Sequence, residues 1–133
     1  MKIGSIAFGN RIENCQVGTI KYSREYSDNN VLLVNKEWDT QTDRFLKVQH
    51  FDPKGNLIDT QEYTYLPNKT VEYYKNKSQE YTRTITDEMN EGLLCIKEVF
   101  CSVTNPRCNY IRESIKDSAG KIINIYQDGK KLL

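Results

Sequence analysis

The chain offers few side chains with the chemistry of a catalyst. Its single histidine, His50, precedes Phe51 at the end of an expected strand. A thiol–imidazole pair would need a cysteine brought to His50 from elsewhere in the fold. The sequence has no glycine-rich phosphate loop, no Gly-x-Ser-x-Gly turn and no His-Glu-x-x-His helix. We therefore predict a non-enzymatic protein with no catalytic residues and no cofactor.

The chain contains four cysteines, Cys15, Cys95, Cys101 and Cys108. Their spacing includes no Cys-x-x-Cys pair, which structural zinc sites generally use, so we predict no metal site. Cys95 and Cys101 fall on the same face of an extended strand, where small buried core residues are expected. Cys101 and Cys108 flank an expected turn and could oxidise in an exported protein, whereas a cytoplasmic protein keeps its thiols reduced.

The nine tyrosines are the most informative side chains. Tyrosine is favoured in strands and at protein interfaces, so the excess fits either packing within a sheet or partner binding. Tyr22 and Tyr26 share one face with Arg24 and could line a pocket or form a binding patch. We predict partner-binding residues on adjacent hairpins, namely the aromatic residues Trp38, Tyr63, Tyr65 and Tyr73 and the acidic turn residues Asp39 and Asp43.

Length and charge remove several classes of function. The 133 residues fit one domain, which we place at residues 1–133. The 19 basic and 18 acidic residues interleave along the chain, so the electrostatic basis for binding nucleic acid or an anionic membrane is missing. The apolar residues at the start break at Gly9, too soon for a signal-peptide core, and no segment approaches the ~20 apolar residues of a membrane span. We expect a cytoplasmic protein.

Turn signals recur along the chain at the spacing of an antiparallel meander, roughly every 8 to 12 residues. Runs rich in Tyr, Thr, Val and Ile lie between them, and we predict about ten strands and no helix. Both faces of residues 31–34 and 93–96 are apolar, which favours a strongly bent all-β sheet closed as a barrel or folded as a sandwich. The predicted strands are 3–8, 17–27, 31–38, 43–51, 57–66, 70–75, 79–86, 93–103, 109–116 and 121–127.

Two turns share one mechanism. Each begins with an aspartate, Asp52 or Asp117, and has a glycine in the fourth position, Gly55 or Gly120. The aspartate can accept hydrogen bonds from the turn backbone, while the glycine takes the left-handed conformation that closes the hairpin.

These turns carry a resemblance to known families. Residues 51–57, followed by Tyr63-Thr64-Tyr65, resemble the aromatic-Asp-x-x-Gly-Asn unit of RHS or YD-type repeats, and residues 115–122, followed by Tyr126, are similar to the hairpin unit of bacterial antitoxin-like repeat proteins. The turns between them, at residues 67–68 and 76–77, depart from the repeat pattern. The resemblance implies a small β-rich protein of a bacterial polymorphic toxin system.

Two functions from different classes follow. The first is an immunity or antitoxin-type protein that binds and neutralises a cognate bacterial toxin domain. The second is a carrier of an apolar small ligand, because a meander of this size is similar to the intracellular lipid-binding barrels. Those barrels insert two helices after their first strand, however, and residues 9–30 show no helical period. An internal cavity of several hundred Å³ would favour the carrier.

Overall fold

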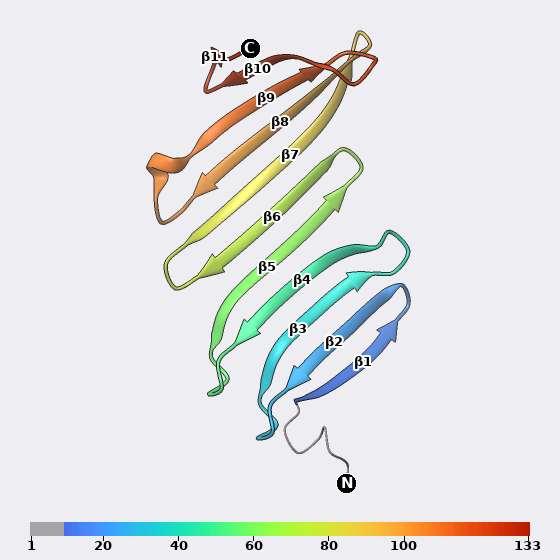
Figure 1. Ribbon diagram of the computed structural model, residues 1–133, viewed down its shortest axis with the longest axis vertical. Helices are drawn as coiled ribbons and strands as arrows, with labels where there is room; N and C mark the ends of the chain where they lie inside the picture. Colours follow the sequence, from blue (N-terminus) through green and yellow to red (C-terminus); the bar gives the residue numbers. More distant parts are fainter. Residues whose placement is uncertain (1–9) are drawn as a thin grey trace. The chain divides into compact units, whose positions relative to one another are not determined.

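The computed structural model describes residues 10–133, so the strand predicted over residues 3–8 lies outside the described residues. The described chain is an all-β antiparallel meander of eleven strands that follow one another in chain order (Figure 1). Among these residues no helix has the length and apolar character needed to cross a membrane. The elements are β1 (Arg11–Val17), β2 (Ile20–Tyr26), β3 (Leu32–Asp39), β4 (Arg44–Phe51), β5 (Leu57–Leu66), β6 (Lys69–Asn76), β7 (Glu80–Asn90), β8 (Leu93–Ser102), the short 3-10 helix η1 (Pro106–Cys108), β9 (Tyr110–Lys116), β10 (Ile122–Gln127) and β11 (Lys130–Lys131).

The chain divides into two compact units. The first unit comprises the residues up to Tyr63 together with Lys75–Lys77, and the second comprises Thr64–Tyr74 and Ser78–Leu133. Strands β1 to β4 therefore belong to the first unit and β7 to β11 to the second, whereas β5 and β6 contribute residues to both.

The predicted all-β meander is confirmed, and β5 has the predicted bounds. The main error concerns residues 17–27, predicted as one strand. They form the end of β1, a two-residue turn and β2, with Val17 opposite Ile20. Gly18 takes a φ of +63° in this turn, and a glycine in the first position of a two-residue loop is typical of the tight turns that match strand twist. The two-residue strand β11 and the three-residue 3-10 helix η1 were also not predicted.

The predicted mechanism of the two aspartate turns is confirmed. Asp52 Oδ1 accepts hydrogen bonds from the backbone N–H groups of Lys54 and Asn56, both at 2.9 Å, and Gly55 has a φ of +87°. The Asn56 N–H, together with the Asn56 amide and the Lys54 N–H, lowers the pKa of Asp52. The turn at Asp117 repeats this arrangement: Asp117 Oδ1 accepts from Ala119 N and Lys121 N at 2.9 Å.

In the first unit, cross-strand pairing places different side chains on the two faces. One face, here called the polar face, carries a row of directly opposed residues that crosses five strands: Glu13, Arg24, Asn35, Gln49 and Thr60. The opposite face, here called the tryptophan face, carries the cross-strand row Lys21, Trp38 and Phe45 and the row Val34, His50 and Asp59.

The second unit also has two distinct faces. β7 pairs with β8 along its whole described length, from Tyr81 opposite Ser102 to Asn90 opposite Leu93. Tyr81 and Ile85 therefore lie on one face of β7, and three threonines at alternate positions lie on the other: Thr82, Thr84 and Thr86. This is the alternation that the sequence indicates.

No hydrophobic residue of the described chain is buried. The three buried residues are polar: Asn35 at 7%, Thr60 at 4% and Ser102 at 9% exposed. The predicted burial of Cys95 and Cys101 is wrong, because Cys95 is half-buried and Cys101 is exposed, and all four cysteines are free thiols. Apolar side chains thus lie on sheet faces that nothing within the described chain covers completely.

The predicted closure of the sheet is not confirmed. The strand order is linear, with no pairing between β1 and β11 within residues 10–133, so the sheet is not closed as a barrel. The prediction relied on strands such as residues 93–96 that are apolar on both faces. Leu93, Leu94 and Cys95 are all half-exposed, so an apolar residue on each face does not require a second layer here.

Candidate functional site

The structure divides the predicted partner-binding residues between the two units. Four of them, Trp38, Asp39, Asp43 and Tyr63, belong to the first unit, whereas Tyr65 and Tyr73 belong to the second. The four predicted rings are all half-buried, and in β6 the Tyr73 hydroxyl donates a hydrogen bond to the Glu80 carboxylate at 2.9 Å. None of the four rings is fully buried.

Trp38 is the centre of an aromatic patch on the tryptophan face. It lies between Lys21 of β2 and Phe45 of β4 in register. Its ring centroid is 6.1 Å from that of Phe45, and the Lys21 ammonium lies 5.5 Å from the indole. Phe45 is 49% exposed. Gln61 pairs with Val48 on the tryptophan face. Tyr63 follows Gln61 by two residues on β5, so it lies on the tryptophan face as well.

Asp39 and Asp43 bracket the turn that joins β3 to β4. Asp39 Oδ1 accepts a hydrogen bond from the Gln41 N–H at 2.9 Å, and Asp43 takes a left-handed φ of +56°. Both aspartates therefore shape the turn, as short-range aspartates commonly do. Asp43 is also exposed, so it can still meet a partner. By its register opposite Ile20, Asp39 lies on the polar face, whereas Lys21, Trp38 and Phe45 lie on the tryptophan face. We call Lys21, Trp38 and Phe45, together with Asp43 in the adjoining turn, the tip surface.

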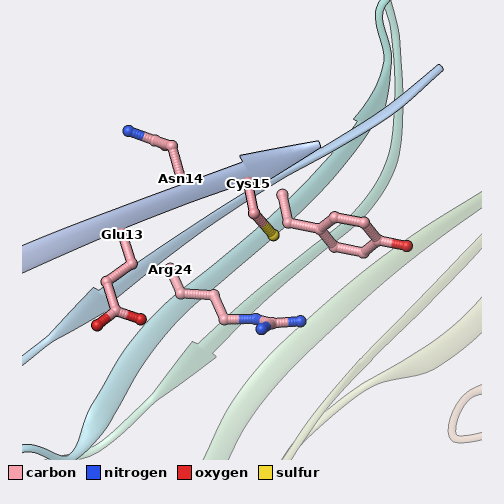
Figure 2. A pocket seen from close by; sticks show the side chains of 5 residues that line it. Glu13, Asn14, Cys15 and Arg24 are labelled. Atoms are coloured by element: carbon pink, nitrogen blue, oxygen red, sulfur yellow. The ribbon is translucent and has the colours of Figure 1, made fainter. Parts of the chain in front are cut away.

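A hollow of about 330 Å³ lies on the polar face, between β1 and β2. Figure 2 shows Glu13, Cys15 and Arg24 directed to one side and Asn14 directed to the other. Tyr22 completes the lining, and the Arg24 guanidinium lies 5.5 Å from its ring centroid. The sequence analysis predicted that Tyr22 and Arg24 share one face. It did not predict strand β1, whose residues Glu13 and Cys15 line the other side of the hollow.

The Arg24 side chain is fixed by the polar row. Its Nε donates to Asn35 Oδ1 at 3.3 Å, and the Asn35 amide donates to Gln49 at 3.1 Å and to Glu37 at 3.2 Å. The positive charge of Arg24 is thus part of a hydrogen-bonded network that crosses strands β2, β3 and β4. Such a network orients a polar contact surface.

The second unit carries an aromatic set that the sequence did not identify. Tyr81 and Phe100 rings lie 5.0 Å apart, Phe100 and Tyr110 5.3 Å apart, and Tyr74 stacks on Tyr81 at 5.3 Å. We call these four residues, one each from β6, β7, β8 and β9, the aromatic ladder. Finding it requires the register of four strands, which no local pattern indicates.

An ionic cluster borders the ladder. Arg83 Nε lies 2.8 Å from a Glu98 oxygen, and a guanidinium nitrogen lies 3.8 Å from Glu72. Tyr110 also donates to Glu98, at 2.5 Å. This hydrogen bond, aided by partial burial, raises the pKa of Tyr110. Burial first, and then the Glu72 charge, raise the pKa of Tyr81.

The geometry around His50 suits a structural contact better than catalysis. His50 Nδ1 lies 2.7 Å from Asp59 Oδ1, its cross-strand neighbour. Ser23 lines the same 180 Å³ hollow, but β3 separates its strand from that of His50. Two strand spacings are about 9 to 10 Å, too far for direct proton transfer. Cys15 of the first unit faces the opposite side of the sheet.

No group of His, Cys, Asp and Glu side chains within residues 10–133 is arranged to hold a metal ion. The two units present half-exposed aromatic side chains and hydrogen-bonded polar side chains on their sheet faces. A comparison with protein-family models, with curated proteins and with solved structures finds no match to this chain.

Proposed function

We propose that the chain is a non-enzymatic binding protein of the immunity or antitoxin type, which neutralises a cognate bacterial toxin domain in the cytoplasm. The observation that carries the proposal is the tip surface. Trp38 and Phe45 are large rings held in contact on one face, with the Lys21 ammonium beside the indole and Asp43 exposed in the turn that joins the two strands. Binding energy at interfaces is concentrated in such aromatic anchors surrounded by polar groups.

The resemblance of residues 51–65 and 115–126 to RHS, YD-type and antitoxin-like repeats supports this choice of partner. The near-neutral charge of the chain favours a toxin that is not a strongly basic nuclease, because inhibitors of basic nucleases present an acidic face. The apolar-carrier alternative has less support, since the hollows described above lie on open sheet faces and the sheet is not closed as a barrel.

The test uses the polypeptide encoded by the reading frame next to the gene for this chain. We expect that polypeptide to arrest growth when expressed alone and to be harmless with this chain, with the two proteins forming a complex measurable by calorimetry. Trp38→Ala should weaken binding by about 30-fold or more, the loss of one aromatic anchor.

Tyr22→Ala is the matched control, because Tyr22 lies on the opposite face of the same unit. It should leave the affinity within about threefold of the wild type, which is a difference of under 1 kcal/mol. A non-toxic neighbour with no affinity for the chain contradicts the proposed function. Equal effects of the two substitutions contradict the assignment of the tip surface.

A further inference from the structure

Two lysines lie beside Trp38 on the tryptophan face of the first unit. Lys21 is opposite Trp38 on β2, and Lys36 precedes Trp38 by two residues on β3, so both share its face. Within residues 10–133 neither lysine forms an ion pair. Their cross-strand neighbours are all uncharged: Gln16 and Trp38 for Lys21, and Ser23 and Val48 for Lys36.

The strand carboxylates of the tryptophan face lie away from Trp38, and both have partners. Glu25 accepts a hydrogen bond from the Asn10 amide at 2.7 Å, and Asp59 lies 2.7 Å from His50. Glu25 lines a hollow with Lys36, but it is four residues from Lys21 along β2, which is about 13 Å. In the turn beyond Trp38, the exposed Asp43 adds one carboxylate against the two ammonium groups.

The polar face of the same unit differs in this respect. Each of its charged residues on β1 to β5 lies opposite or beside a residue of the other sign. The Arg11 Nε lies 3.4 Å from the Glu13 carboxylate. The cross-strand pairs are Glu13 with Arg24, Lys47 with Glu37 and with Glu62, and Arg44 with Asp39. Only the tryptophan face therefore has cations that the chain itself does not match.

A partner that covers Trp38 also covers the Lys21 ammonium. The ammonium lies 5.5 Å from the indole, so a side chain packed on this ring excludes water from it as well. Burying a charge is costly unless an opposite charge is supplied. The described chain places no carboxylate opposite Lys21, so the partner must bring one.

We propose that the tip surface, extended by Lys36, receives an acidic segment of the toxin domain. A carboxylate of that segment pairs with Lys21, while an apolar side chain packs on Trp38 and Phe45. The inference rests on the proposed function and names the chemistry of the partner at the same surface. A nucleic acid also carries anions, but the formal charge of +1 on the chain lacks the basic excess on which such binding depends.

The first test uses Trp38 itself, which is the single tryptophan of the chain and therefore the only source of indole fluorescence. The quenching constants of iodide and caesium are compared with that of neutral acrylamide, which reports access alone. At an ionic strength of about 0.15 M, Lys21→Gln should lower the relative iodide constant by about twofold and raise the relative caesium constant.

Lys47→Gln is the matched control, because it removes the same charge from the polar face on the neighbouring strand. It should leave both relative constants near the wild-type values. Equal iodide quenching in the wild type and in Lys21→Gln overturns the proposal, since the charge of Lys21 would then not act at Trp38.

The second test uses the polypeptide encoded by the adjacent reading frame. Its rate of association with the wild-type chain should fall by about tenfold or more as the ionic strength rises from about 0.02 to 0.5 M. This measurement needs no variant. Lys21→Gln should raise the dissociation constant by about tenfold, and Lys47→Gln should change it by less than about threefold.

The outcomes separate this inference from the proposed function. A complex whose association rate is independent of salt, or one that Lys21→Gln does not weaken, overturns the acidic segment and leaves the binding protein in place. The absence of any complex overturns both. A single-stranded oligonucleotide that binds at Trp38 more tightly than the polypeptide does would make nucleic acid the occupant, which also overturns the inference.

Discussion

At the scale of single residues, the aromatic side chains of this protein obtain their roles from their cross-strand neighbours. Trp38 lies against Phe45 and the Lys21 ammonium on one unit, and Tyr110 lies against Phe100 and donates to Glu98 on the other. Aromatic pairs and cation–π contacts of this kind each contribute about 0.5 to 1.5 kcal/mol. The same rings that stabilise the sheet are thus only half-buried, except Phe45, which is 49% exposed.

The two ladder tyrosines predict a pH dependence. Their folded-state pKa values are raised above 10.0, so ionisation favours the unfolded chain. The contribution of these two tyrosines to the free energy of unfolding is fully present below about pH 10, their unfolded-state pKa. It is lost as the pH rises through their folded-state pKa values. We expect the free energy of unfolding, measured in urea, to fall more steeply between pH 9 and about 11 in the wild type than in Tyr81→Phe/Tyr110→Phe. A double variant with the same slope as the wild type would contradict this assignment.

At the scale of elements, tight turns of defined chemistry determine where the hairpins end. The Asp52 and Asp117 turns use the same side-chain acceptors, and a third turn, at Ser27, places Asn30 at a φ of +64° in the glycine position. Asn30 N donates to Ser27 O at 2.9 Å. Asparagine tolerates the left-handed region better than most residues, so this turn forms without glycine.

Gly55→Val tests the turn mechanism. A β-branched residue is strained at a φ of +87°, and we expect a loss of about 1 kcal/mol or more in the free energy of unfolding. For a chain of this length this lowers the melting temperature by roughly 3 to 5 °C. Lys54→Val, in the same exposed turn but outside the positive-φ region, should cost less. Equal melting temperatures for the wild type and Gly55→Val would show that the turn does not require glycine.

At the scale of the whole molecule, the main feature is that none of the described hydrophobic residues is buried. Folded domains usually offset the loss of conformational entropy by burying apolar surface. In each unit here, the backbone hydrogen bonds of the sheet are joined by half-buried cross-strand pairs, such as Trp38–Phe45 and Phe100–Tyr110, and by polar networks such as the one around Asn35.

A calorimetric prediction follows from this burial pattern. The heat-capacity change on unfolding grows with the apolar area that becomes exposed, and ordinary globular domains give about 12 to 15 cal/mol/K per residue. We expect this chain to give a clearly smaller value, because none of its described hydrophobic residues is buried. Scanning calorimetry at several pH values provides the number, and a value in the ordinary range would mean that the chain buries a conventional core.

The sequence by itself determined the features that depend on a few adjacent residues. The Asp-x-x-Gly turns at Asp52 and Asp117 and the bounds of β5 could be predicted, because backbone sterics and short-range hydrogen bonds act within four or five residues. The Gly18 turn was missed although its signal was present, since a glycine that opens a two-residue loop is also a local pattern.

Only the tertiary structure decided which side chains meet across the strands. The contacts of Trp38 with Phe45 and of Tyr81 with Phe100 depend on register, and a shift of one residue moves every side chain to the other face. Alternation in the sequence separates the threonines of β7 from Tyr81 and Ile85, but it does not say whether anything covers either face. That depends on non-local contacts. For this reason, strands that are apolar on both sides were not sufficient to predict a sheet closed as a barrel or folded as a sandwich.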